Sequence, residues 1–194
     1  MDTTAAGDIW NTGTKITGPT AAASGDNSMF YTLPELMDSL ELTTSMAPGT
    51  GANETHISYG VAYTGFDGLT LKYGSGESGA KAAETTSTTM FVSYAISSFT
   101  LSLSNTEADN AAAVNREVDS YQLAYTVSDD MSLTYGKETF EKGGESVDEE
   151  ITSLGVSYTT GGMTLSADTY ESKGVANTAG TKTNRWALGL SFAF

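Results

Sequence analysis

The sequence contains no cysteine and a single histidine, His56. Without cysteine the chain has neither a disulfide framework nor a thiolate metal site. It also lacks the Gly-x-Ser-x-Gly elbow of serine hydrolases and a glycine-rich phosphate loop between a strand and a helix. His56 precedes an expected strand, so we interpret it as a solvated rim residue. These absences predict a protein that is not an enzyme and that uses no cofactor or metal.

Long apolar runs and positive charge are scarce as well. No segment approaches the roughly 18 consecutive apolar residues of a membrane-spanning helix. The 24 acidic residues outnumber the 9 basic ones, and the formal charge of -15 disfavours nucleic acid as a partner, because its phosphates would be repelled. Residues 1–10 have neither the basic start nor the apolar centre of a signal peptide. We expect either that such a peptide was removed or that the chain begins after the natural start.

What the sequence does contain is an alternation of large apolar and small residues with a period of two. In the last nine residues the large side chains share one parity, namely Trp186, Leu188, Leu190, Phe192 and Phe194. Alternate side chains of a strand point to opposite faces, so one face of this segment is wholly apolar. A soluble β-sandwich would bury such a face, whereas a lipid-facing barrel strand would display it.

The same alternation recurs along the chain and favours strands over helices. The expected strands are 27–33, 40–46, 57–63, 69–73, 90–96, 99–103, 121–127, 131–137, 152–158, 163–169 and 186–194. Short turns alternate with long loops, which are expected at 47–56, 74–89, 105–120, 138–151 and 170–185. Short turns at one end and long loops at the other are typical of an antiparallel transmembrane β-barrel. The fold class predicted is therefore all-β.

Five tyrosines recur at intervals of 31 to 33 residues, each near the end of a strand that precedes a short turn. With the terminal phenylalanine they are predicted to form an outward aromatic girdle at one membrane interface. Its members are Tyr31, Tyr63, Tyr94, Tyr125, Tyr158 and Phe194. The opposite parity carries mainly Ser, Thr, Gly and Ala, which are too small and polar to fill a dry core. We therefore expect a lumen that holds water.

Eleven strands are an odd number, whereas bacterial single-chain barrels have an even one. One solution is a small closed barrel with a twelfth strand at 9–16. The other is that the chain is the C-terminal part of a larger barrel. Residues 26–42 favour the second solution: with Asn27, Ser28, Tyr31 and Pro34, they resemble a segment that follows the constriction loop in Gram-negative general porins. The C-terminal alternation, ending on Phe194, is similar to the signature of outer-membrane barrels.

This resemblance implies that residues 27–194 supply about eleven or twelve strands of a sixteen-stranded barrel in the bacterial outer membrane. Residues 1–26 would then be the tail of the constriction loop. The implied function is passive diffusion of small hydrophilic solutes and ions through a water-filled channel. The implied partners are outer-membrane lipid, lipopolysaccharide, the barrel-assembly machinery and further copies of the chain in a homotrimer.

Four charged residues are candidates for steering ions in the lumen. Lys72, Asp168 and Arg185 have the inward parity, and Glu41 lies nearer a strand end. The alternative is that each is a wall residue solvated by channel water and contributes little alone.

Two acidic clusters, at 107–119 and 138–150, are expected in long loops. There they would draw cations toward the mouth or hold Mg²⁺ or Ca²⁺ that bridges lipopolysaccharide, although no EF-hand loop is present. We therefore expect a weak preference for cations. Two other functions stay open: a structural or adhesive outer-membrane barrel with a narrow or filled lumen, and a secreted soluble β-protein.

Overall fold

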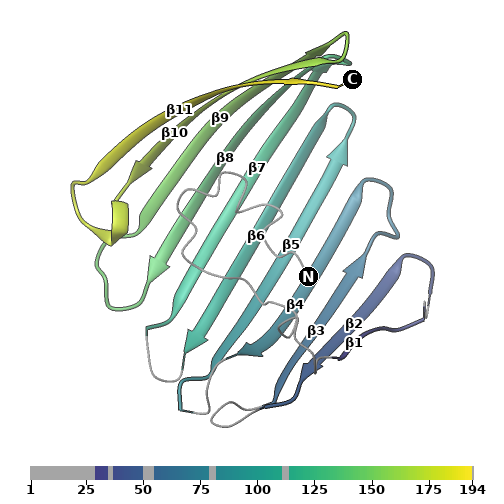
Figure 1. Cartoon of the computed structure of the whole chain (residues 1–194), viewed down its shortest axis with the longest axis vertical. Coiled ribbons are helices and arrows are strands. Elements are labelled where there is room, and N and C mark those ends of the chain that lie inside the picture. The colour runs from purple at the N-terminus through teal and green to yellow at the C-terminus, as the bar shows by residue number, and fades with distance from the viewer. Residues whose placement is uncertain (1–28, 35–36, 50–54, 79–81, 111–113, 194) are drawn as a thin grey trace.

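The structure, a computed structural model, describes residues 29–34, 37–49, 55–78, 82–110 and 114–193. These residues form one antiparallel sheet in which each strand pairs with the next along the chain (Figure 1). Its eleven strands are β1 (Met29–Thr32), β2 (Leu40–Ala47), β3 (His56–Tyr63), β4 (Leu69–Ser78), β5 (Thr85–Ile96), β6 (Phe99–Asn110), β7 (Arg116–Ser128), β8 (Met131–Lys142), β9 (Glu149–Thr160), β10 (Met163–Lys173) and β11 (Lys182–Phe192). A single 3-10 turn, η1 (Val175–Asn177), lies between β10 and β11. Within these ranges no helix has the length and apolar character to span a bilayer.

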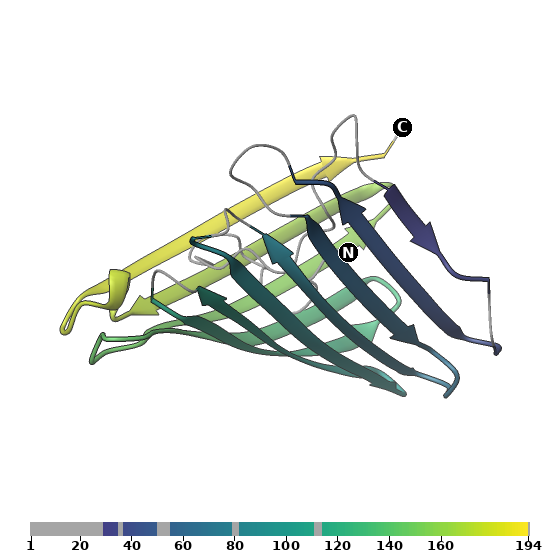
Figure 2. The same ribbon diagram turned by 90° about the horizontal axis from the view of Figure 1, so that it is seen from below.

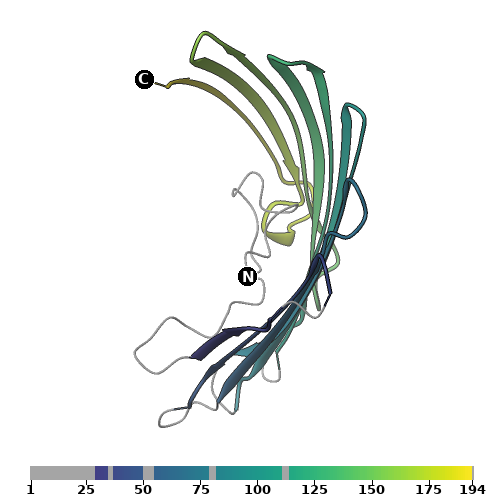
Figure 3. The same cartoon turned by 90° about the vertical axis from the view of Figure 1, so that its right-hand side faces the viewer.

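The all-β fold class and the eleven predicted strands are confirmed. The sheet is bent into an open trough and does not close on itself within the described residues (Figures 2 and 3). The proposed twelfth strand at 9–16 and the proposed constriction-loop tail at 1–26 lie outside the described residues.

The prediction of long loops was wrong in extent. Strands β5 to β8 each continue for several residues into segments expected to be loops, so that β6 reaches Asn110 and β8 reaches Lys142. The acidic clusters accordingly lie mostly on paired strands. The reason is that one face of these extensions carries polar side chains, such as Glu107 and Glu117, where the predicted strands carry large apolar ones. The apolar signal with a period of two therefore stops although the backbone ladder continues.

The two faces of the sheet differ in character. On β7 the side chains of Tyr121, Leu123, Tyr125 and Val127 share one face and are 36–43% exposed. Six residues of a strand extend about 20 Å, so these four form an apolar belt of that length along the strand. The opposite face carries small polar residues at the same level, which include the buried Ser102 of the neighbouring strand.

The small polar face lies on the inside of the curve. Glu149, Ser153, Gly155 and Ser157 share this face of β9. A carboxylate oxygen of Glu149 accepts a hydrogen bond from the backbone N–H of Ala176 in η1 at 3.0 Å, and η1 lies on the concave side of the sheet (Figure 3). The large apolar side chains are therefore on the convex face, as the alternation predicts.

Four of the predicted girdle tyrosines, Tyr63, Tyr94, Tyr125 and Tyr158, lie on the convex face close to the short turns. From each to the next the register moves two residues toward the turn: Tyr63 lies opposite Leu71, whereas Tyr94 lies opposite Leu69 of the same strand. A constant stagger of this kind is what tilted barrel strands produce. It brings the four rings to a similar height along the axis.

The two ends of the predicted girdle behave differently. Tyr31 lies opposite Thr44, two residues farther from the turn than the stagger requires. At the other end, the next step of the stagger falls on Phe192, which lies opposite Met163. Phe194, the residue expected there, is outside the described residues. The location of these rings at a membrane interface stays a prediction.

Neighbouring residues on opposite faces allow a direct test of which face meets lipid. In phospholipid vesicles, Leu123→Lys should lower the free energy of unfolding by roughly 2–4 kcal/mol, because a lysine would replace an apolar side chain near the middle of the belt that we expect to face lipid. Gln122→Lys, on the adjacent concave position, should change it little because we expect that face to meet water. Denaturant titration of both variants measures the difference. Equal costs at the two positions would contradict the assignment of the faces.

Candidate functional site

The concave face and its rim are the candidate site, because the polar side chains of successive strands face the inside of the curved sheet there. All four charges predicted to face the lumen, Lys72, Asp168, Arg185 and Glu41, lie on this face. They form two groups, at opposite ends of the sheet. Their influence on ions stays a prediction.

The first group lies on β2 and β4. Glu41 is directly opposite Ala62, and Ala62 is directly opposite Lys72, so the two charges are two strands, or about 9–10 Å, apart. The ammonium of Lys72 lies 5.7 Å from the centre of the Phe91 ring. That contact is within cation–π range and keeps the lysine head against the wall.

The second group lies on β10 and β11. Asp168 is opposite Ala187, and Arg185 is two residues along the same strand, so the opposite charges are diagonal neighbours. Gly155 on the other side makes room for the aspartate: a Cβ at this glycine would lie 2.6 Å from an Asp168 carboxylate oxygen. Each group pairs one acid with one base, which gives local fields of mixed sign.

Charged side chains divide unequally between the two faces of the strands. The concave face carries four acids and four bases: Glu41, Glu138, Glu149 and Asp168 against Lys72, Arg116, Lys142 and Arg185. The convex face carries eight acids and three bases: Glu77, Glu107, Asp109, Glu117, Asp119, Glu141, Glu150 and Glu171 against Lys137, Lys173 and Lys182. The excess negative charge of the strands therefore points away from the concave side of the sheet.

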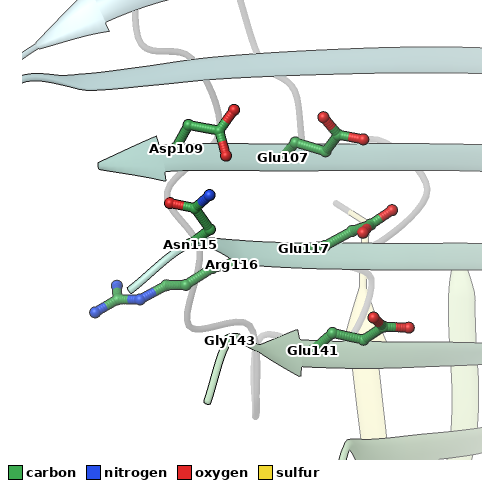
Figure 4. Close-up of a pocket in the computed structure, with 7 residues that line it drawn as sticks. All are labelled: Glu107, Asp109, Asn115, Arg116, Glu117, Glu141 and Gly143. Atoms are coloured by element: carbon green, nitrogen blue, oxygen red, sulfur yellow. The ribbon is translucent and has the colours of Figure 1, made fainter. Parts of the chain in front are cut away.

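The densest negative charge lies beyond the apolar belt at the loop end of β6, β7 and β8. Glu107, Glu117 and Glu141 are directly opposite one another on these three strands (Figure 4). They line a shallow pocket of about 320 Å³ together with Asp109, Asn115, Arg116 and Gly143. Directly opposed like charges destabilise a sheet, so this arrangement carries an energetic cost.

One amide offsets part of that repulsion. The side-chain nitrogen of Asn105 donates hydrogen bonds to a carboxylate oxygen of Glu117 at 2.6 Å and to one of Asp119 at 3.0 Å. Glu141 has a less favourable setting. Partial desolvation, followed by the charges of Asp148, Glu117 and Asp119, raises the pKa of its carboxyl above the usual value.

Farther along the same rim the charges are paired. Lys137 binds Glu150 at 2.6 Å, and Glu171 contacts both Lys173 and Lys182. The two lysines hold the pKa of the Glu171 carboxyl below its usual value, through hydrogen bonds first and charge second. Negative potential on the convex rim is thus concentrated over β6 to β8.

An apolar cluster on the concave face was not expected from the sequence. Ala108, Val118 and Phe140 pack together there at 2–8% exposure, and Ile151 on β9 is 5% exposed. The prediction that the inward face carries mainly small or polar residues does not hold at this level. These residues fall in segments assigned to loops, where no face could be assigned from the sequence.

Within the described ranges, no group of three or more His, Asp or Glu side chains is arranged to hold a metal ion. His56 is the first residue of β3, at the loop end. The concave face thus combines a polar wall, scattered charges and one buried apolar level.

Comparison with known proteins defines the fold further. No protein-family model matches the chain, and no curated protein does either. Solved structures do match, among them an anion-selective porin from Comamonas acidovorans with a TM-score of 0.67 and 16% identity over 87% of this chain. The outer-membrane protein OmpT of Vibrio cholerae matches with a TM-score of 0.59 and 17% identity over 85% of this chain. OccK10 (OpdN) of Pseudomonas aeruginosa matches with a TM-score of 0.60 and 15% identity over 84% of this chain.

At these identities the likeness establishes the fold, which is porin-like and of the outer-membrane β-barrel class. The chain spans about three-fifths of the length of these structures, covering 59%, 64% and 61% of them respectively.

The raised pKa of Glu141 leads to a prediction about stability. Replacing Glu141 by Gln should raise the free energy of unfolding at pH 7 by roughly 0.2–1 kcal/mol, since it removes one of three opposed charges. A carboxyl with a raised folded-state pKa is disfavoured once it ionises, so this advantage should be full above that pKa and vanish as the pH falls below the usual glutamate value.

Urea titration in detergent at pH 7 and pH 4 measures the effect. Glu145→Gln is the matched control, because Glu145 is exposed and paired with Lys142 at 2.8 Å, and its replacement should not stabilise the protein. A Glu141→Gln variant that is no more stable than wild type at pH 7 would show that the opposed charges are compensated.

Proposed function

We propose that this chain forms part of a porin of the bacterial outer membrane, through which small hydrophilic solutes and ions diffuse passively. The observation that carries the proposal is the division of faces along the strands. Large apolar side chains cover the convex face and small polar ones the concave face, in a sheet whose fold is that of porins. A wall of this kind separates hydrocarbon outside from water inside.

The mechanism needs no turnover site, and we propose that the protein is not an enzyme. Solutes are selected by the width of the lumen and by the charges along its wall. Two groups of wall charges would set opposing local fields that orient a dipolar solute without binding it. One group is Lys72 with Glu41, and the other is Asp168 with Arg185.

We also propose a weak preference for cations. The net charge of -15 gives the whole protein a negative long-range field, which raises the local concentration of cations. The preference is weak because acids and bases balance on the concave face of the strands. The porin from Comamonas acidovorans is described as anion-selective, so a porin-like fold does not by itself fix the sign of the selectivity, which depends on the placement of individual charges.

The partners we propose follow from the convex face. Its apolar belt would contact outer-membrane lipid. The acidic rim over β6 to β8 would face lipopolysaccharide, and divalent cations would bridge its carboxylates to the lipopolysaccharide. The side chains of Trp186, Leu188, Leu190 and Phe192 on β11 are 55–76% exposed on this face. They would present the signature that the barrel-assembly machinery recognises. We propose a homotrimer as the functional assembly and no nucleic-acid partner.

A second function has one observation in its favour. The buried cluster of Ala108, Val118 and Phe140 shows that part of the concave face is dry. A barrel whose lumen is filled at that level would serve a structural or adhesive role and would not conduct.

Conductance in planar lipid bilayers decides between these functions. The natural polypeptide, reconstituted from detergent, should show stepwise single-channel currents, and under a KCl gradient its reversal potential should indicate a small excess of cation flux. Complete absence of steps would favour the structural barrel. Steps with an anion-selective reversal potential would retain the porin and refute the preference.

The role of Lys72 is open to a paired test. Lys72→Gln should shift the reversal potential toward greater cation selectivity by several millivolts, because it removes a positive charge from the lumen wall. Lys137→Gln removes the same charge from the convex face and should leave the reversal potential unchanged. If both variants shift it equally, net charge and not the position of the wall charge determines selectivity.

A further inference from the structure

The connection between β10 and β11, residues 174–181, turns back onto the concave face of the sheet. Its 3-10 turn η1 lies inside the curve (Figure 3). We call this segment the inward loop. A loop that merely joined two strands of a hairpin would need no contact with other strands, so its partners on β8 and β9 require an explanation.

Two side chains fasten the inward loop to the sheet. Glu149 of β9 is 3% exposed, and its carboxylate accepts hydrogen bonds from the Ser172 hydroxyl at 3.1 Å and the Ala176 backbone N–H at 3.0 Å. From the loop side, the Asn177 amide donates to the carbonyls of Phe140 at 3.4 Å and of Val147 at 3.1 Å. Asn177 is itself 8% exposed. The loop is thus tied to two strands and to the neighbouring β8–β9 connection.

The inward loop also has a defined internal conformation. Gly174, Ala176 and Asn177 all have positive φ values, of 65°, 56° and 56°. Non-glycine residues adopt this conformation only where the surroundings determine it. The Thr181 hydroxyl donates to the carbonyl of Thr178 at 2.7 Å and also lies within 3.2 Å of the carbonyl of Val175. A side chain at position 174 would collide with the carbonyl of Asp148, so the loop fits closely against its neighbour.

The level at which the loop attaches is where the concave face is apolar. Phe140, whose carbonyl accepts the hydrogen bond from the Asn177 amide, is 2% exposed, and Val118 beside it is 4% exposed. Glu149 lies directly opposite Phe140 on the next strand. Loop and apolar cluster therefore occupy the same level of the concave face, where packed protein lies inside the curve of the sheet.

We propose that the inward loop is a fixed constriction of the channel mouth and that Glu149 and Asn177 are the residues that hold it in place. This inference rests on the proposed function, because a constriction has meaning only in a barrel that transmits solutes. The two residues act by positioning the loop and need not touch the solute.

The first test reads the position of the loop without any conductance. The chain has no cysteine, so Ala179→Cys introduces a single site that a maleimide can label. The maleimide is attached to a polymer of roughly 5 kDa and added from outside, because a reagent of that size is too bulky to enter a narrowed mouth freely. Labelling should be slower than at Pro48→Cys, an exposed position just after β2. Adding Asn177→Ala or Glu149→Ala should speed labelling at position 179 by roughly tenfold, as the loss of a hydrogen bond to a charged or buried group implies, and leave position 48 unchanged.

Equal labelling rates at positions 179 and 48 in the otherwise wild-type protein would overturn the inward position. Rates at 179 that ignore both substitutions would overturn the role of the two residues.

The second test measures single-channel conductance. The Gly174 amide donates to the Thr181 carbonyl at 3.0 Å, so the base of the loop is already paired and residues 175–180 can be replaced by Asn-Gly, a two-residue hairpin turn. Shortening the loop should raise conductance by roughly one half or more, and Asn177→Ala should raise it less. Glu145→Gln, in the neighbouring connection, is the control and should have no effect.

The outcomes separate this inference from the proposed function. A conducting wild type whose conductance does not change on shortening refutes the constriction and leaves the porin intact. A silent wild type that conducts once the loop is shortened refutes an open channel and supports the loop as the obstruction. If both are silent, the conducting function and the constriction fail together.

Discussion

Backbone hydrogen bonding between successive strands is the constraint on which the rest of the structure depends. A strand can hold an apolar side chain in hydrocarbon only if its own N–H and C=O groups are paired, because no water is there to satisfy them. Each strand from β1 to β11 is hydrogen-bonded to the next along the chain. Among the described strands, only the outer edges of these two lack a partner strand. We propose that further strands of the barrel pair with both, which accords with a chain that spans about three-fifths of its structural neighbours.

The same constraint explains which parts of the fold can be predicted from the sequence. Large and small residues must alternate in a barrel strand that has lipid on one face and water on the other, and every segment of this chain with that alternation proved to be a strand. Beyond the apolar belt the outer face is polar while backbone pairing continues. Glu117 and Val118, for example, alternate on β7 as regularly as Leu123 and Gln122 do, yet a polar side chain on the outer face removes the apolar signal. The predicted strands therefore ended too early, and the acids were assigned to loops.

The candidate site was predictable in part, for the same reason. Parity alone placed Lys72 and Asp168 on the inner face. It could not identify the apolar cluster around Phe140 or the attachment of the inward loop, because these depend on contacts between residues distant in sequence. Glu149 lies in a run of acids that is normally interpreted as a solvated segment. In the structure it is buried and accepts a hydrogen bond from the backbone N–H of Ala176, which is 27 residues away. Nothing local to Glu149 distinguishes it from its neighbour Glu150, which faces the opposite side and pairs with a lysine.

Net charge is correspondingly a poor guide to what this protein would conduct. Of the acids on the strands, the larger share points outward, where dissolved ions and lipid headgroups would screen them within a Debye length. A solute in the lumen would instead experience the mixed charges of the concave face, at close range and with less solvent between. An acidic protein of this design can therefore be nearly neutral toward permeating ions, and its discrimination would then depend chiefly on width. The constriction that we propose lies at the level where Phe140, Glu149 and Asn177 meet, so size selection and the anchoring of the inward loop become the same physical question.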